Sequence, residues 1–316
     1  ERLAGGSQNV LVKFELGGRG FVLRKAAATS YADGDETMRR EARVLRALKD
    51  TPVPHARLIA SCENRDVIGG AFYLMEPVDG FNVAIGMPSL HAGSAAVRRE
   101  MGFAMVEALA ALGEVDYAAA GLEDFGRIDN FLERQIGRWS RQLESYGKYA
   151  RWPGVQSLPA VTQIAAWLDS HRPLQFEPGI VHGDYHLKNV LFCNGSPEIA
   201  AIIDWELSTL GAPLIDLGWL LATWREPGGG SSSTPIIIEP WEGFPSSDEL
   251  IERYAQRSGR DVSDIQWYRV FACFKLALII EGTHARACAG QADLELGRKF
   301  HTNAVNLLLR AVEWVT

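Results

Sequence analysis

The sequence predicts an α+β chain in which a small β-rich lobe precedes a larger, mostly helical lobe. Strand-like runs dominate the residues before Gly80, and Pro77 and Gly80 then break regular structure. Apolar residues recur at helical spacing over most of the remaining chain. Because single cores stop growing at roughly 250–300 residues, 316 residues suffice for two lobes. We predict lobes at 1–76 and 81–316, joined by a hinge at 77–80.

The first lobe is predicted to be a small antiparallel sheet with one helix. The runs "NVLVKFEL" and "GFVLRKAA" flank "GGRG", the Gly-rich connection expected of a hairpin. In "ETMRREARVLRALKD", apolar residues recur at helical spacing beside a charged face. The run "VIGGAFYLMEPVDG" then predicts a second hairpin around Gly69 and Gly70.

The second lobe reads as helical, with two short strand-like pieces, "GIVHGDYHLKNVLF" and "EIAAIIDW". The segment from Glu226 to Thr234 is rich in Gly and Ser, and we expect a mobile loop there. The periodic segments predict helices near residues 97–115, 127–147, 159–171, 248–258, 264–288 and 292–315.

Composition limits the partners and the compartment. The formal charge of −7 favours neither nucleic acid nor an anionic membrane as a partner. The longest apolar run, 270–280, is too short to cross a bilayer and contains Lys275, so we expect a core helix and no membrane span. The four cysteines show no metal-type spacing and predict reduced thiols in the cytoplasm. Glu1 is not a natural start, so we expect residues before it.

The stretch "VHGDYHLKNVLF" places polar groups between apolar ends that favour burial. Asp184 and Asn189 lie five residues apart, the D-x-x-x-x-N spacing of a kinase catalytic loop. Phosphoryl transfer needs a carboxylate that orients or deprotonates the attacking hydroxyl and a nearby amide oxygen that holds Mg²⁺. A short loop between two buried strands would aim both groups into one cleft.

A second carboxylate follows the next strand-like piece. Asp204 ends "EIAAIID", fifteen residues after Asn189, where it would chelate Mg²⁺. The alternative is an Asp that caps a helix or forms a turn.

These motifs resemble those of the aminoglycoside phosphotransferase and choline kinase-like superfamily. "HGDYHLKNVLF", "IIDWE" and "PLIDLGWLL" occur in that family's order, and the resemblance extends over essentially the whole chain. It implies a protein-kinase-like bilobal fold, with one helix of the αC type in the sheet-containing lobe. It also implies ATP, or GTP, as phosphoryl donor and Mg²⁺ as cofactor.

The resemblance assigns nucleotide contacts in the first lobe. "LAGGSQN" resembles the family's nucleotide loop, with Gly5 and Gly6 approaching phosphates and Ser7 and Asn9 as polar neighbours. The cation that contacts the α- and β-phosphates falls on Arg24. Lys25 is the alternative, but it would point to the opposite face of the strand.

Further nucleotide residues follow from the same resemblance. Glu41 fits the helix glutamate that orients the phosphate-binding cation, although a solvated helix charge is the alternative. "FYLMEPVDG" resembles the hinge, where backbone groups of Glu76 and Val78 would bind adenine and Met75 would pack beside it. Lys188 would help to neutralise the γ-phosphate unless it is an ordinary solvated lysine.

Two residues are expected to support the catalytic loop. The resemblance makes His182 a structural residue that hydrogen-bonds within the loop, and Asp216, twelve residues after Asp204, a second supporting group. A zinc ion on His182, His186 and Asp184 is the alternative.

The C-terminal part indicates a subgroup and a region for the acceptor. "YRVFACFKLALIIEGTHARACAG" resembles the kinase-like domains fused to acyl-CoA dehydrogenases. Glu281, His284 and Arg286 lie within about one and a half turns of one helix and are predicted to face the acceptor. An internal salt bridge and helix cap is the alternative for these three residues.

The resulting hypothesis is a kinase that transfers a phosphoryl group from ATP or GTP to a hydroxyl of a small molecule. The acceptor is an aminoglycoside-like compound or a metabolite, with a hydroxyacyl thioester as one candidate. A nucleotide-binding scaffold without activity is a second hypothesis. A protein kinase is a third, although Gly183 replaces the Arg of H-R-D, and Trp205 replaces the Phe of D-F-G.

Overall fold

The computed structural model of the chain describes residues 1, 9–27, 34–226, 228 and 236–315. They form two compact units. The first contains Glu1–Gly126, Gly179–Leu210 and Pro240–Phe244, and the second contains Arg127–Pro178, Gly211–Glu239 and Pro245–Thr316. The two units are defined by their internal contacts and not by nucleotide binding. The predicted lobes at 1–76 and 81–316, with a hinge at 77–80, therefore stay a prediction. No helix among the described residues is long and apolar enough to cross a membrane.

The first unit contains a four-stranded antiparallel sheet with strand order β1-β2-β4-β3. Its strands are β1 (Asn9–Leu16), β2 (Arg19–Ala26), β3 (Leu58–Cys62) and β4 (Phe72–Met75). Gly17 and Gly18 connect β1 to β2 with φ angles of 60° and 76°. Two successive positive φ angles are what a tight hairpin turn needs and what glycine adopts without strain. The predicted first hairpin is therefore confirmed.

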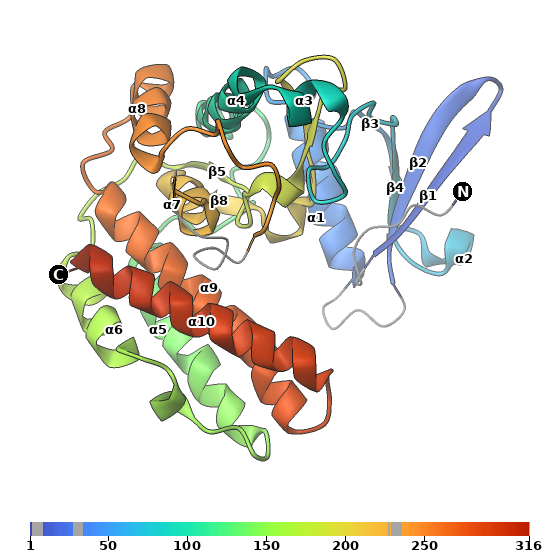
Figure 1. Cartoon of the computed structure of the whole chain (residues 1–316). Coiled ribbons are helices and arrows are strands. Elements are labelled where there is room, and N and C mark those ends of the chain that lie inside the picture. The colour runs from blue at the N-terminus through green and yellow to red at the C-terminus, as the bar shows by residue number, and fades with distance from the viewer. Residues whose placement is uncertain (2–8, 28–33, 227, 229–235, 316) are drawn as a thin grey trace. The chain divides into compact units, whose positions relative to one another are not determined.

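Helix α1 (Gly34–Ala47) packs against this sheet, as Figure 1 shows. Met38, Ala42 and Leu45 are buried, which confirms the predicted apolar face. Asp35 and Glu36 lie in the first turn, where their negative charge interacts favourably with the helix dipole. Glu41 falls on the same buried face because it follows Met38 by three residues and precedes Leu45 by four.

The predicted second hairpin around Gly69 and Gly70 is wrong in its first arm. Arg65–Ile68 forms the short helix α2 instead of a strand. The Asn64 side chain accepts a hydrogen bond from the Asp66 amide at its start, and Gly69 ends it in the left-handed conformation. The second arm does form β4, which pairs with β2 and with the earlier strand β3.

The rest of the first unit carries the two predicted strand-like pieces of the second lobe, which are confirmed as β5, β6 and β7. Strands β6 and β7 form an antiparallel pair, and β5 pairs with β8, whose last residue belongs to the second unit. The helices and strands of this part of the chain are α3 (Ser89–Gly93), α4 (Ala95–Gly113), β5 (Gly179–Val181), η3 (Leu187–Asn189), β6 (Val190–Phe192), β7 (Ile199–Ile202), η4 (Trp205–Leu207) and β8 (Thr209–Gly211).

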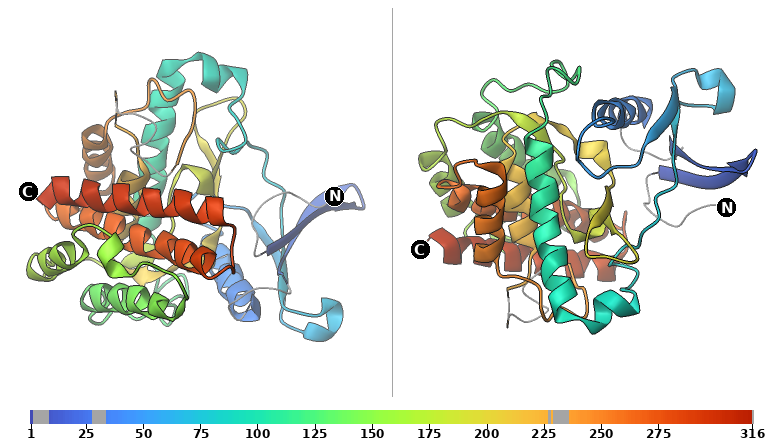
Figure 2. Two further views of the ribbon diagram at one scale, coloured as in Figure 1. Left: turned by 60° about the horizontal axis from the view of Figure 1, so that its bottom comes forward. Right: turned by 90° about the horizontal axis from the view of Figure 1, so that it is seen from above.

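The regular structure of the second unit is almost entirely helical over its described residues, and α9 and α10 pack along each other, as Figure 1 and the left view of Figure 2 show. The predicted helices are confirmed, and α7 was not predicted. Every residue of α7 from Ile215 to Thr223 is buried, so its sequence lacks the polar face that marks a helix. The elements are α5 (Glu133–Glu144), η1 (Ser145–Lys148), η2 (Val155–Ser157), α6 (Val161–Ser170), α7 (Leu214–Thr223), α8 (Ser247–Ser258), α9 (Ile265–Cys288) and α10 (Leu294–Val315).

Candidate active site

The loop between β5 and β6 is held at both ends by buried apolar residues. Val181 before it and Val190 and Phe192 after it are at most 1% exposed. Within the loop, Tyr185 is fully buried, and its hydroxyl donates a hydrogen bond to the Met105 carbonyl of α4 (2.7 Å). These anchors fix the backbone, so the polar side chains between them have defined positions.

Gly183 allows the loop to turn against the segment that follows β7. Its φ is +88°, and a Cβ at this position would lie 2.5 Å from the Leu207 carbonyl oxygen. Both the left-handed backbone and the close approach require glycine. An Arg at this position, as in the H-R-D motif of protein kinases, would not fit here.

Asp184 is positioned by two neighbours in its own loop. The side-chain amide of Asn189 donates to the Asp184 carbonyl oxygen (2.8 Å) and to Asp184 Oδ2 (2.9 Å). His186 Nε2 lies 3.3 Å from the other carboxylate oxygen, Oδ1. The Asp184 side chain keeps 31% of its surface exposed, so it is accessible to a reacting group.

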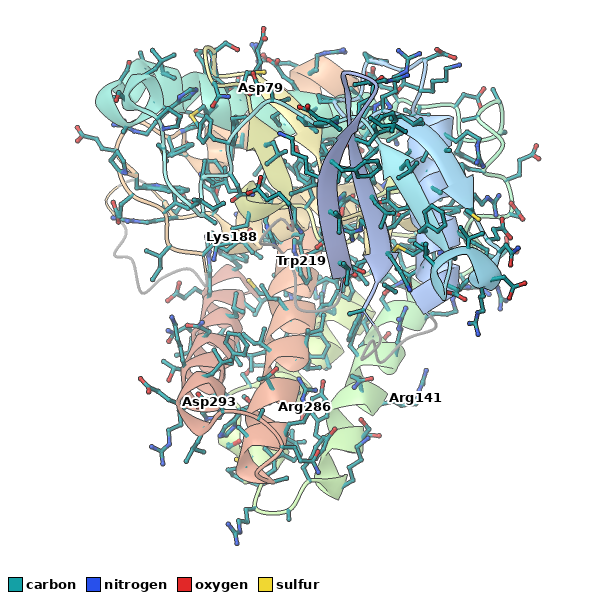
Figure 3. All side chains as sticks on the ribbon, turned by 90° about the vertical axis from the view of Figure 1, so that its right-hand side faces the viewer. Asp79, Arg141, Lys188, Trp219, Arg286 and Asp293 are labelled. Atoms are coloured by element: carbon teal, nitrogen blue, oxygen red, sulfur yellow. The ribbon has the colours of Figure 1, made fainter. Side chains whose placement is uncertain are left out.

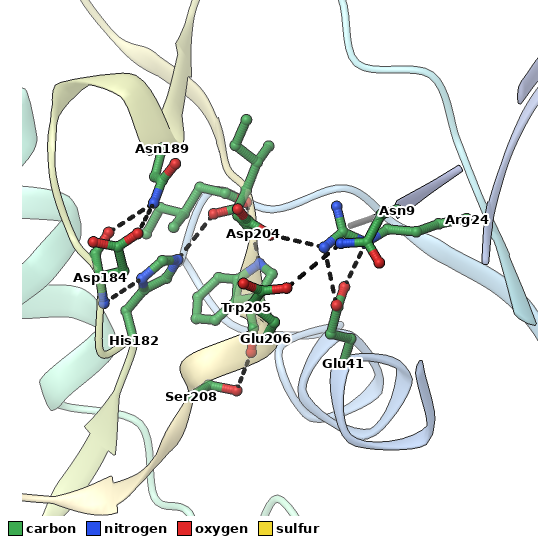
Figure 4. Close-up of polar contacts among 12 residues, drawn as sticks. Asn9, Arg24, Glu41, His182, Asp184, Asn189, Asp204, Trp205, Glu206 and Ser208 are labelled. Carbon is green, nitrogen blue, oxygen red and sulfur yellow. Dashed lines mark hydrogen bonds and ion pairs between the residues drawn. The ribbon is translucent and has the colours of Figure 1, made fainter. Parts of the chain in front are cut away.

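His182 connects this loop to the end of β7. Its Nε2 lies 2.9 Å from the Ile203 carbonyl oxygen, and its Nδ1 accepts a hydrogen bond from the Asp184 amide (3.3 Å), as Figure 4 shows. These contacts fit a neutral imidazole that carries its proton on Nε2. Because both ring nitrogens have backbone partners, this geometry does not favour zinc on His182. It agrees with the supporting role predicted for the residue.

The pairing of β6 with β7 brings Asp204 close to the loop between β5 and β6. Val190 faces Ile202 in the register, and the Ile203 amide donates to the Asn189 carbonyl (2.9 Å). Asp204 is the next residue after Ile203 and therefore lies close to Asn189. It occupies the N-cap position of η4 with φ of 66°, yet its side chain makes no capping hydrogen bond. The carboxylate pairs with an arginine instead, so capping does not explain this residue.

That arginine is Arg24, and it belongs to a buried polar chain (Figure 4). Its guanidinium contacts Glu41 through two nitrogens (2.8 and 2.9 Å) and Asp204 Oδ1 (2.7 Å). Tyr73, opposite Arg24 in the β2–β4 register, donates its hydroxyl proton to Glu41 (2.7 Å). Glu41 is 1% exposed, so the solvated-charge alternative is wrong. Lys25 points elsewhere and binds the Ile68 carbonyl (2.5 Å).

Burial and the neighbouring charges act in opposite directions on the pKa values of Arg24 and Glu41. Burial disfavours the charged form of Arg24, but Glu41, Tyr73 and Asp204 outweigh it and raise the pKa of the guanidinium. Burial raises the pKa of Glu41, while Arg24 and the Tyr73 hydroxyl act against that shift. An arginine that touches two carboxylates stays charged, and it is the cation that the structure brings to Asp204.

A third carboxylate, Glu206, lies in the same region. Burial, with the nearby charges of Asp204 and Glu41, raises the pKa of Glu206. The Asn9 side-chain amide lies 3.5 Å from one of its oxygens, which places Asn9 beside the site. Because these surroundings disfavour the ionised form of Glu206, a cation bound nearby would stabilise that form.

The donor groups fit a magnesium ion. Mg²⁺ prefers oxygen ligands, and Asp204 supplies a carboxylate whose side chain is 37% exposed. Asn189 directs its amide nitrogen towards Asp184, which leaves its amide oxygen for another partner. Asn189 and Asp204 are thus the residues that would hold the ion.

The predicted hinge follows β4 directly. Met75 ends the strand, and the Glu76 amide donates to the Arg57 carbonyl (2.9 Å). The Glu76 side chain pairs with Arg19 (2.8 Å). Adenine binding by Glu76 and Val78, beside Met75, stays a prediction.

Other predicted nucleotide residues are exposed or lie outside the described residues. Lys188, labelled in Figure 3, is exposed and directly precedes Asn189 in the chain, and its γ-phosphate contact stays a prediction. Gly5, Gly6 and Ser7 lie outside the described residues, as does most of the Gly- and Ser-rich segment after Glu226.

The remaining predicted residues lie in the second unit. Asp216 is fully buried in the first turn of α7. Glu281 of α9 is also fully buried and contacts His284 (2.9 Å), which matches the internal-pair alternative for these two residues. Arg286 donates to the Thr283 hydroxyl (2.9 Å). Their roles towards the catalytic loop or an acceptor stay predictions.

Comparison with known proteins identifies the family. The sequence profile described as "Phosphotransferase enzyme family" matches residues 1–271. The chain belongs to this phosphotransferase family. The predicted resemblance is therefore confirmed.

Among curated relatives, mouse acyl-CoA dehydrogenase family member 10 is 31% identical over 295 residues, which are 91% of this chain and 26% of that protein. Rat acyl-CoA dehydrogenase family member 11 is 31% identical over 299 residues, which are 92% of this chain and 37% of that protein. The chain thus spans between a quarter and two fifths of the curated relatives it matches. They fit the predicted subgroup.

Solved structures confirm the predicted protein-kinase-like α+β fold. A candidate aminoglycoside phosphotransferase from Ralstonia eutropha has a TM-score of 0.79 and 32% identity, covering 99% of this chain and 92% of that one. Spectinomycin phosphotransferase in complex with ADP and spectinomycin has a TM-score of 0.65 and 13% identity, covering 99% and 93%. At that identity the second likeness shows the fold alone.

Several contacts around the candidate site were not predicted from the sequence. Asn82 donates to the Lys188 and Val190 carbonyls (2.7 and 3.3 Å), which fixes the end of the loop between β5 and β6. Tyr73 holds Glu41, and Glu206 adds a third acid. The register of β2 and β4 would have revealed Tyr73, but no local signal in the sequence links Asn82 to the loop.

Proposed function

We propose that the chain is a small-molecule kinase that transfers the γ-phosphoryl group of ATP or GTP to a hydroxyl group. The observation that carries this proposal is the contact between Arg24 and Asp204. It joins the sheet of the first unit to the segment after β7, whose Ile203 amide is bonded to Asn189 in the loop that holds Asp184. A phosphate-binding cation, two oxygen ligands and an accessible carboxylate thereby lie in one region.

Each group has a role in this proposal. Asp184 orients the acceptor hydroxyl and accepts its proton, with His186 and Asn189 fixing the carboxylate. Arg24 contacts the nucleotide phosphates and is held by Glu41. Asn189 and Asp204 hold Mg²⁺, which, when bound, neutralises negative charge on the phosphates.

The acceptor proposal rests on the relatives. Two of them are named as acyl-CoA dehydrogenases, and the chain matches only a part of each. A kinase domain joined to an enzyme of acyl-CoA chemistry would act on a related molecule, so we favour a hydroxyacyl thioester. The Ralstonia protein keeps an aminoglycoside as the second candidate. In either case Glu281, His284 and Arg286 remain proposed acceptor residues.

The test measures nucleotide binding and turnover separately. Calorimetry with MgATP and MgGTP gives the donor preference, and ADP or GDP release is followed with hydroxyacyl-CoA, free hydroxy acids and aminoglycosides. Asp204→Asn is the informative variant, because Asn tolerates the left-handed backbone at this position as Asp does. We expect it to weaken MgATP binding by at least tenfold.

Three results would contradict the proposal. Unchanged MgATP affinity in Asp204→Asn would mean that Asp204 is not a metal ligand. Nucleotide binding without transfer to any acceptor would favour the inactive scaffold. Phosphorylation of protein side chains alone would favour a protein kinase.

A further inference from the structure

Three side chains that commonly bind metal ions meet between α9 and α10, within the second unit. Glu281 Oε1 lies 2.9 Å from His284 Nδ1, and Glu281 Oε2 lies 2.8 Å from His301 Nδ1. The potential ligand atoms of the three residues all lie within 4.8 Å of one another. They belong to the second unit, whereas the residues proposed to bind the nucleotide and Mg²⁺ belong to the first; Glu281 and His284 are also proposed acceptor residues, and a metal ion would give them a different role.

Helix geometry explains why they meet. Glu281 and His284 are three residues apart on α9, so they share one face of that helix. Gly297 lets α10 approach α9 closely, because a Cβ there would lie 2.4 Å from the Ala287 side chain. His301 lies one turn beyond Gly297 and therefore faces the Glu281 carboxylate. Figure 3 shows Arg286 and Asp293 near the turn that joins the two helices.

The Glu281 carboxylate requires partners because it is fully buried. A buried carboxylate is costly unless donors or cations surround it. Trp152 Nε1 donates to Oε1 (2.7 Å), and the two imidazoles contact Oε1 and Oε2. Protons on the two Nδ1 atoms satisfy these contacts, and so would one metal ion shared by both rings and the carboxylate.

We propose that Glu281, His284 and His301 bind a divalent transition metal ion of the zinc type. Two imidazole nitrogens and one carboxylate are a donor set that zinc uses, and a water molecule would complete a tetrahedral site. Binding replaces the proton on each Nδ1, which moves to Nε2 of the same ring or to solvent. No redox step or further reactant is involved.

Two outer contacts are of the kind that support the ligands of a metal ion. His284 Nε2 lies 3.4 Å from Cys288 Sγ, so a proton on Nε2 has an acceptor while Nδ1 faces the carboxylate. The Trp152 N–H in turn orients Glu281. Such partners fix the tautomer of a ligand histidine and the position of a ligand carboxylate. Cys288 acts as an outer partner because its sulfur lies on the Nε2 side of the ring.

The ligand atoms lie near one another, within 4.8 Å, but not at the spacing of a tetrahedral site, so binding requires them to move. Zn–N distances of about 2.0–2.1 Å imply separations of roughly 3.3 Å between tetrahedral ligand atoms. The observed separations of 2.8 and 2.9 Å would open by a few tenths of an ångström. The His301 side chain is 25% exposed, which gives the ion a route of entry and a position for water. A bound ion would tie α10 to α9.

The experiment titrates the full chain with Zn²⁺ in calorimetry, with Mg²⁺ in excess to occupy oxygen-rich sites. We expect one zinc ion per chain and a rise in Tm on binding. His301→Gln should lose more affinity than the roughly 10–100-fold that an outer partner contributes. His171→Gln is the matched control, because His171 is an exposed histidine of the same unit, and it should bind zinc like the natural chain.

Co²⁺ spectroscopy supplies an independent readout. We expect visible bands of a four-coordinate nitrogen and oxygen site, without a thiolate charge-transfer band, and their loss in His301→Gln. Glu281→Gln tests the carboxylate, and if it fails to fold, His301→Gln still decides. Absence of zinc binding in the natural chain, or unchanged binding in His301→Gln, overturns the proposal. A changed acceptor KM in His301→Gln with unchanged zinc binding would instead support the predicted acceptor role of this helix.

Discussion

The side-chain amide of Asn189 holds Asp184 at two points, its backbone carbonyl (2.8 Å) and its carboxylate Oδ2 (2.9 Å). One group therefore fixes both the loop backbone and the direction of the proposed catalytic carboxylate. With the amide nitrogen used in this way, the amide oxygen of Asn189 remains for a metal ion. The spacing of five residues is what allows both tasks.

Asp184→Asn should lower kcat by about 10²–10⁴-fold, the usual contribution of a positioned base. MgATP affinity should stay within a few-fold, since the carboxylate serves the acceptor. The new amide can keep its oxygen towards Asn189, so folding should be preserved. Steady-state kinetics and calorimetry measure the two effects, and a near-normal kcat would exclude Asp184 as the catalytic group.

Glu41→Gln should destabilise the chain by about 3–5 kcal/mol, because it leaves the buried Arg24 without its main counter-charge. Tyr73→Phe is the matched variant. It removes only the hydrogen bond to Glu41 and should cost about 1–3 kcal/mol. Urea unfolding of both variants gives the comparison. Equal losses would show that the ion pair adds nothing beyond a neutral hydrogen bond.

Gly183→Ala should lower Tm, because the new Cβ would meet the Leu207 carbonyl at 2.5 Å in a left-handed backbone. Gly195→Ala is the control in the same unit, since no atom lies within 4 Å of its added Cβ. Thermal unfolding followed by circular dichroism compares them. If both variants have the same Tm, the close approach at Gly183 is not a constraint on the loop.

Glu206→Gln should stabilise the nucleotide-free chain in a pH-dependent manner. The folded state raises the pKa of Glu206, mainly through burial, so its ionised form is disfavoured on folding. This penalty is absent below the ordinary value of 4.5 and grows as pH rises through the folded pKa. The gain in Tm should therefore be larger near neutral pH than below 4.5.

Exposed Glu63 supplies the control for that experiment, and Glu63→Gln should show no comparable pH dependence. A gain in Glu206→Gln that is the same on both sides of the ordinary pKa would mean that lost charge is not its cause.

Local patterns in the sequence were sufficient for much of the architecture. The hairpin at Gly17 and Gly18 and the helix with Met38 on its buried face follow from turn chemistry and apolar spacing. Where two local signals competed, the sequence misled. Gly69 was interpreted as a hairpin turn, although with Asn64 it caps a short helix.

By itself, the sequence determined which groups are present in the proposed catalytic loop and after β7, since Asp184, Asn189 and Asp204 are set by spacing along the chain. Tertiary structure alone decided that Arg24 contacts Asp204, that Tyr73 holds Glu41, and that His301 meets Glu281. The reason is physical: periodicity reports which face of an element is buried, but it does not report which distant element covers that face.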